Sequence, residues 1–167
     1  MQNAKCVDKY MVFESKGRQI KICDSVLSII RKYLQCDRKT CEAGGVLIGR
    51  ENLSNSNLIM EYATEPMPKD KRSRNRFYRG DNGHIDFYRN LYEESQRIYA
   101  YVGEWHTHPE AVPSYSIIDL KNWREIGKDA FQDSTQIHLI AGYDTLRLWE
   151  FSSSTQAITE LITMRWS

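Results

Sequence analysis

Apolar residues recur along the chain at two spacings, which predicts strands interleaved with helices. Apolar positions at helical spacing predict helices at 25–35, 84–97 and 116–128. Short apolar runs bounded by turn residues predict strands at 10–13, 18–23, 46–48, 58–63, 99–105, 136–142, 146–151 and 157–164. The first two strands flank a Ser15-Lys16-Gly17 turn, and turn residues at 52–57 indicate an antiparallel pair on either side. The pattern predicts an α+β fold, with a curved, mostly antiparallel sheet and about three helices.

Length and charge narrow the class of protein. A chain of 167 residues fits a single domain, 1–167. With 23 basic and 22 acidic residues, no global field favours nucleic acid or an anionic membrane. The sequence carries neither a basic-then-apolar leader nor an apolar run near 18 residues, so we expect a cytoplasmic protein that does not span a membrane.

The four cysteines, at 6, 23, 36 and 41, lack the C-x-x-C spacing of a structural zinc site. In a reducing cytoplasm we expect free thiols. Cys41, beside Glu42, is a candidate nucleophile, but passive packing is the simpler interpretation.

Positive charge is concentrated between Pro68 and Asp81. This basic segment contains Lys69, Lys71, Arg72, Arg74, Arg76 and Arg79. A solvated loop is the simplest interpretation. The alternative is a docking surface for an acidic partner, to which Phe77 and Tyr78 would add contact area. Nucleic-acid binding is disfavoured, because no recognised motif accompanies the charge.

The stretch 103–119, GEWHTHPEAVPSYSIID, holds the strongest chemical signal. His106 and His108 lie two apart at the end of a predicted strand, so both imidazoles can face one cleft, and Asp119 follows early in a helix. Imidazole and carboxylate suit zinc, and three protein ligands leave a position for water. Without a metal, the histidines could be ordinary hydrogen-bonded residues and Ser116 to Asp119 a helix capping box. The two interpretations are compatible.

The motifs of other metal hydrolases fit this sequence less well. The H-E-x-x-H motif of helical zinc proteases is absent. His108 and Glu110 supply the H-x-E of zinc deaminases, but no C-x-x-C follows.

The arrangement resembles the JAMM motif of the JAB/MPN metalloprotease family: H-x-H, seven residues, then S-x-x-D. The upstream E-x-G-G-x-L-x-G strand of that family is matched by 42–49, EAGGVLIG. The resemblance implies a JAB/MPN-like, cytidine-deaminase-like fold. It also implies one catalytic zinc ion held by His106, His108 and Asp119, with Glu42 as general base and Ser116 helping to stabilise the oxyanion.

The expected chemistry is hydrolysis of a peptide or isopeptide bond. Zinc lowers the pKa of water from 15.7 toward about 7. Glu42 then takes a proton and returns it to the departing amine. Glu104, two residues before His106, is a local rival as base, or a carboxylate that orients an imidazole. Glu42 is preferred because its sequence context matches the family.

The substrate is the weakest inference. Family members with the intact motif mostly remove ubiquitin-like proteins or process their C-termini. The GEWHTHP form looks like the stand-alone bacterial branch, and is similar to the deconjugating peptidases of type II CBASS antiphage operons, whose target is joined to the C-terminus of a cGAS-like nucleotidyltransferase. Processing of a sulfur-carrier or other ubiquitin-like tail, and a non-catalytic MPN scaffold, are the alternatives. The oligomeric state is left open.

Overall fold

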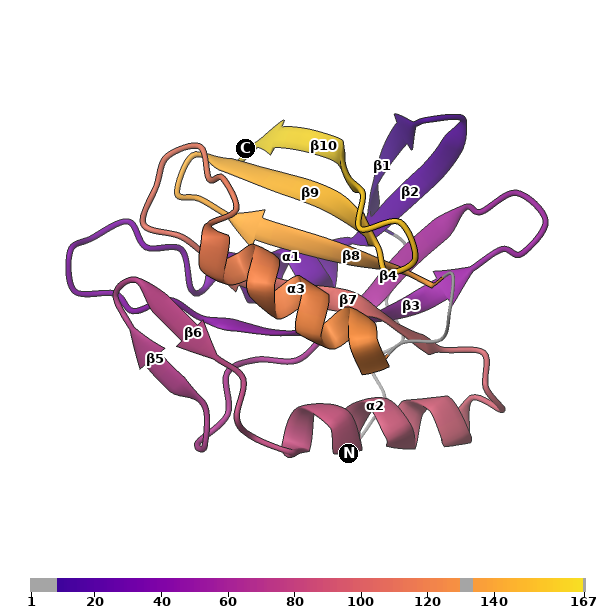
Figure 1. The fold of residues 1–167 in the computed structure, drawn as a ribbon, viewed down its shortest axis with the longest axis horizontal. Coiled ribbons are helices and arrows are strands. Elements are labelled where there is room, and N and C mark those ends of the chain that lie inside the picture. Colours follow the sequence, from indigo (N-terminus) through magenta and orange to yellow (C-terminus); the bar gives the residue numbers. More distant parts are fainter. Residues whose placement is uncertain (1–8, 130–133, 167) are drawn as a thin grey trace.

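A computed structural model describes residues 9–129 and 134–166. The main sheet consists of β1 (Tyr10–Ser15), β2 (Arg18–Cys23), β3 (Gly44–Glu51), β4 (Leu58–Ala63), β7 (Ala100–Thr107), β8 (Thr135–Ala141), β9 (Thr145–Ser152) and β10 (Ile158–Arg165). A separate hairpin is formed by β5 (Lys71–Ser73) and β6 (Arg76–Tyr78), and the helices are α1 (Asp24–Arg31), α2 (Gly83–Glu94) and α3 (Ile117–Asp129). Figure 1 shows the hairpin beside the sheet and beside the first turn of α3.

The strand order of the main sheet is β1-β2-β4-β3-β7-β8-β9-β10. Only the β2–β4 and β7–β8 pairings among these described strands are parallel. The predicted α+β class with a mostly antiparallel sheet is therefore confirmed, as are the first hairpin and the antiparallel pairing of β3 with β4.

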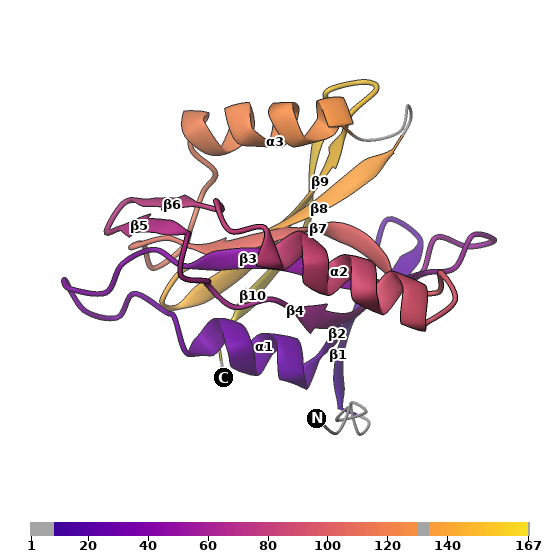
Figure 2. The same ribbon diagram turned by 90° about the horizontal axis from the view of Figure 1, so that it is seen from below.

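Each face of the sheet buries a different hydrophobic cluster. Helix α1 covers one face and α3 the other (Figure 2). Successive residues of β8 show the alternation, because Leu139 belongs to the cluster that α1 completes and Ile140 packs with Trp123 of α3. A fully buried large apolar side chain contributes about 1.5–3 kcal/mol. The burial of Trp123 therefore holds α3 against β8 and β9 and sets the position of the N-terminal turn of this helix.

Two helices are shorter than their apolar patterns predict. Helix α1 ends at Arg31 rather than at residue 35, because Lys32 and Tyr33 donate to the carbonyls three residues back, at 3.2 and 3.0 Å, which tightens the last turn. Helix α2 ends at Glu94 rather than at residue 97, because Gln96 and Arg97 adopt φ of 55° and 68°. Neither angle is compatible with a continuing helix.

The prediction that the basic segment is a solvated loop is only partly right. Most of its residues are exposed, but it contains the β5–β6 hairpin, and three of its cations contact other parts of the chain. Arg72 Nε donates to the Glu42 carbonyl at 2.8 Å, Arg74 Nη1 to the Asp37 carbonyl at 2.8 Å, and Arg79 Nη2 pairs with Glu104 Oε1 at 2.9 Å. The docking of an acidic partner stays a prediction.

The expectation of four free thiols is only partly right. Cys36 and Cys41 are free, Cys23 is disulfide-bonded, and Cys6 lies outside the described residues. Within the described ranges, no helix combines the length and hydropathy needed to cross a bilayer.

Candidate active site

Strand β7 and helix α3 bring the predicted metal ligands together. The Nε2 atoms of His106 and His108 lie 3.0 Å apart. Asp119 approaches both, with Oδ1 3.1 Å from His106 Nε2 and Oδ2 3.2 Å from His108 Nε2. One ligand atom from each of the three residues falls within 4.8 Å of the others. The side chains converge on a single point.

The start of α3 orients the aspartate. The Ser116 N–H and Oγ donate to Asp119 Oδ2 at 2.6 and 2.8 Å, and the Asp119 N–H donates back to Ser116 Oγ at 3.1 Å. This is a reciprocal capping box. A carboxylate in the first turn is also stabilised by the helix dipole. The S-x-x-D segment therefore caps the helix and aims Asp119 at the histidines with the same bonds.

Glu42 lies two residues before β3, the strand next to β7. Gly44 pairs with His106 across β3 and β7, and the pairing continues as Thr107 N–H donates to the Ala43 carbonyl at 2.9 Å. Glu42 thus lies at the level of His108, where it is buried with 6% of its surface exposed. Gly44 leaves room for the hairpin, because a Cβ there would lie 2.6 Å from the Phe77 ring.

Burial and neighbouring charges set the protonation of the site. Burial raises the pKa of Glu42 to about 7, against the lowering effect of His106 and His108. Burial also favours neutral Asp119, but hydrogen bonds from both histidines hold its pKa far below the usual range. Burial lowers the pKa of His108, and the Asp119 carboxylate outweighs this and raises it. Near neutral pH, Glu42 can therefore both accept and release a proton.

The donor set fits a zinc ion. Two imidazole nitrogens and a carboxylate are ligand types that zinc accepts. The two Nε2 atoms and the Asp119 carboxylate oxygens all face one another at 3.0–3.2 Å, as the ligands of a single cation do. Ligand atoms about 2.0–2.1 Å from a tetrahedral zinc lie about 3.4 Å from one another, close to the observed spacing.

All five residues of the predicted site line one cleft of about 380 Å³ between the hairpin and α3; they are Glu42, His106, His108, Ser116 and Asp119. The rival carboxylate, Glu104, lines the same cleft. Its Oε1 accepts from Arg79 Nε at 3.0 Å and from Tyr101 OH at 3.2 Å. The Glu104 carboxylate is therefore already engaged by Arg79 and Tyr101.

Two further histidines escaped the sequence reasoning. His138 lines the cleft beneath α3 and stacks on Trp123 with ring centroids 4.4 Å apart and planes inclined by 10°. Burial lowers its pKa to about 3, so it is neutral. Strand alternation could have placed it on the face shared with Ile140.

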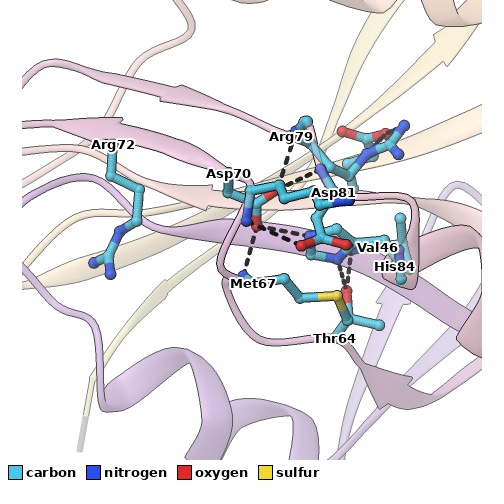
Figure 3. A network of polar contacts seen from close by, with 12 residues as sticks. Val46, Thr64, Met67, Asp70, Arg72, Arg79, Asp81 and His84 are labelled. Carbon is cyan, nitrogen blue, oxygen red and sulfur yellow. Dashed lines mark hydrogen bonds and ion pairs between the residues drawn. The ribbon is translucent and has the colours of Figure 1, made fainter.

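His84 lies in the first turn of α2, and its side chain is fully buried. Figure 3 shows it between Thr64 and Asp70, to which it hydrogen-bonds. It is not among the three clustered ligands.

Comparison with known proteins agrees with this geometry. Residues 24–152 match the family described as prokaryotic homologs of the JAB domain. Relatives named "CD-NTase/cGAS isopeptidase" occur in Pseudomonas aeruginosa (33% identical, covering 73% of this chain and 76% of the relative), Escherichia coli (34%, 70% and 74%) and Vibrio cholerae (32%, 81% and 84%).

A solution structure of a Desulfitobacterium hafniense protein, 18% identical, superposes with a TM-score of 0.53 over 82% of this chain and 83% of that one, which speaks for the fold alone. The family match spans most of the chain and includes the strand that carries Glu42 and the segment that carries the clustered ligands. The chain therefore belongs to the prokaryotic JAB-domain family.

Proposed function

We propose that this protein is a zinc-dependent isopeptidase that hydrolyses the bond after the C-terminus of a conjugated protein, with a cGAS-like nucleotidyltransferase of an antiphage operon as the protein released. The observation that carries the proposal is the convergence of Glu42 with His106, His108 and Asp119 in one cleft. The relatives named "CD-NTase/cGAS isopeptidase" support the nucleotidyltransferase as substrate.

Each residue has a distinct task in this proposal. His106, His108 and Asp119 would hold zinc, which when bound acts as a Lewis acid and lowers the pKa of water. Glu42 takes a proton from the attacking water and delivers it to the departing lysine amine, for which a pKa near 7 is suited.

Ser116 is proposed to donate to the oxyanion of the tetrahedral intermediate. Its hydroxyl donates to Asp119 in the substrate-free protein. It must therefore exchange that carboxylate for the substrate oxygen during the reaction. Asp119 would remain oriented by the Ser116 N–H, which bonds to the same oxygen at 2.6 Å.

The test is cleavage of a defined conjugate. A cGAS-like nucleotidyltransferase joined through its C-terminus to a lysine is incubated with zinc-loaded wild-type protein, Glu42→Gln or Glu104→Gln. We expect cleavage by the wild type, zinc retention without turnover in Glu42→Gln, and substantial activity in Glu104→Gln. Capture of the conjugate by Glu42→Gln from the native host would identify the target. Equal activity of wild type and Glu42→Gln would refute the assignment of the base.

Two alternatives give different outcomes. A peptidase for a sulfur-carrier or other ubiquitin-like tail would cut a linear C-terminal extension and leave the lysine-linked conjugate intact. A non-catalytic MPN scaffold would cut neither and would bind the same partners with or without Glu42.

A further inference from the structure

A second buried cluster of polar side chains lies behind the β5–β6 hairpin, outside the cleft (Figure 3). Thr64 Oγ1 is 2.6 Å from His84 Nδ1, and His84 Nε2 is 2.7 Å from Asp70 Oδ2. The side chains of both His84 and Asp70 are completely buried. Buried polar groups are costly unless they are hydrogen-bonded, so this network imposes a definite geometry on the segments that it joins.

The donors and acceptors of the network form a directed chain. The Val46 N–H donates to Thr64 Oγ1 at 2.9 Å, so the threonine hydroxyl is free to donate to His84 Nδ1. With Nδ1 accepting from Thr64, the Nε2–H tautomer of His84 donates to Asp70. The chain runs from the central strand β3 to the loop that precedes the hairpin.

Asp70 closes the hairpin at its base. Its Oδ2 accepts the Met67 N–H at 2.7 Å, and its Oδ1 accepts the Gly80 and Asp81 N–H groups, each at 3.0 Å. Burial alone raises the pKa of Asp70, but the hydrogen bonds from Met67, His84 and Asp81 outweigh it and lower the pKa. One carboxylate therefore joins the segments that enter and leave the hairpin.

The far side of the hairpin holds Glu42. The Glu42 N–H donates to the Ser73 carbonyl at 2.8 Å, and Arg72 Nε donates to the Glu42 carbonyl at 2.8 Å. Both bonds hold the backbone of Glu42, at its N–H and at its carbonyl, against the hairpin.

We propose that Thr64, His84 and Asp70 are positioning residues for the reaction, acting as a clamp that fixes the hairpin so that Ser73 and Arg72 hold the Glu42 backbone beside the clustered ligands. The inference rests on the proposed role of Glu42 as general base. None of the three residues lines the cleft. Their influence on turnover passes through the backbone of the hairpin, and a misplacement of about 1 Å can reduce turnover by about 10²-fold.

The decisive variant is Asp70→Asn, with Glu61→Gln as its matched control. Glu61 is also a buried, ion-paired carboxylate, 2.7 Å from Arg50, but it lies on β4 and does not contact the hairpin. For Asp70→Asn we expect kcat on the lysine-linked conjugate to fall by about 10- to 100-fold, with KM changed by less than about 3-fold and zinc stoichiometry unchanged. Amide exchange across 71–78 should accelerate, and Glu61→Gln should leave both kcat and this exchange unchanged.

Two substitutions of Thr64 test the same network, and they also serve if Asp70→Asn does not fold. Thr64→Ser keeps the hydroxyl and should retain kcat within about 3-fold, whereas Thr64→Val should behave as Asp70→Asn does. Wild-type kcat in folded Asp70→Asn or Thr64→Val, or an equal loss in Glu61→Gln, would overturn the clamp.

A readout independent of activity separates this inference from the proposed function. The Glu42 amide, which donates to the Ser73 carbonyl of the hairpin, should be protected from exchange in the wild type and in Glu61→Gln, and should lose protection in Asp70→Asn and Thr64→Val. If wild-type protein cleaves no conjugate while this difference persists, the proposed function fails and the clamp stands. If the protein cleaves conjugates but protection of the Glu42 amide is unaffected by these substitutions, the clamp fails alone.

Discussion

Two buried clusters in this protein each contain histidine and aspartate, but their side chains are arranged differently. In the Asp70 network, donors and acceptors alternate, so His84 and its partners are satisfied among themselves. In the cleft, the Nε2 atoms of His106 and His108 face each other at 3.0 Å beside a single carboxylate. A cluster of alternating donors and acceptors holds structure together, whereas two imidazoles and a carboxylate that converge on one point have the ligand types of a metal site.

The largest effect should come from removing one histidine of each cluster. His108→Ala takes away a ligand, so we expect zinc to be lost and cleavage to fall by at least about 10³-fold. His84→Asn should keep full zinc stoichiometry. Metal analysis after dialysis decides the matter, and zinc loss in both variants would mean that the two clusters do not differ as described.

Two carboxylates of the same cleft sharpen the comparison. Glu42→Gln should reduce kcat by about 10²- to 10⁴-fold, because general-base catalysis is lost. Glu104→Gln should reduce it by no more than about 10-fold, because Glu104 is already paired with Arg79. Single-turnover cleavage at matched zinc loading measures both, and the reverse order of effects would assign the base to Glu104.

The raised pKa of Glu42 predicts that replacing this residue stabilises the fold although it removes activity. Because burial raises its pKa from 4.5 to about 7, the carboxyl group favours folding while protonated, and this contribution is lost as pH rises through 7. In zinc-free protein at pH 8, Glu42→Gln should therefore raise the free energy of unfolding by about 1–3 kcal/mol. Urea unfolding at pH 8 and pH 5 checks this, and the difference should shrink at pH 5.

The smallest effect is expected at the surface of the hairpin. Lys71 is exposed, so Lys71→Ala should change the free energy of unfolding by less than about 0.5 kcal/mol. Arg72→Ala should cost about 1–2 kcal/mol, because Arg72 binds the Glu42 carbonyl and lies over the Tyr33 ring. Chemical denaturation measures the free energy of unfolding of both variants. Equal losses of stability would contradict the distinction between Lys71, which is exposed, and Arg72, which binds the Glu42 carbonyl.

The local parts of the site could be predicted from sequence. Strand alternation places His106 and His108 on one face, and the S-x-x-D cap places Asp119 in the next helix. The approach of Glu42 depends on the β3–β7 register, which hydrophobic pattern does not specify, so only the family resemblance indicated it.

Neither the β5–β6 hairpin nor the burial of His84 could be predicted from sequence patterns. The two strands of the hairpin have three residues each and are charged, so no apolar alternation marks them. The burial of His84 depends on Asp70 and Thr64, partners 14 and 20 residues away, which no local spacing reveals.

The separation of Glu42 from the ligands along the chain has a consequence for biosynthesis. Ala43 and Thr107, whose bond brings Glu42 to its place, are 64 residues apart, whereas His106 and Asp119 are near neighbours in sequence. Glu42 is therefore synthesised long before His106 and Asp119, and it can join them only after β7 has been made and has paired with β3. The complete group of side chains cannot assemble within one local segment of the chain.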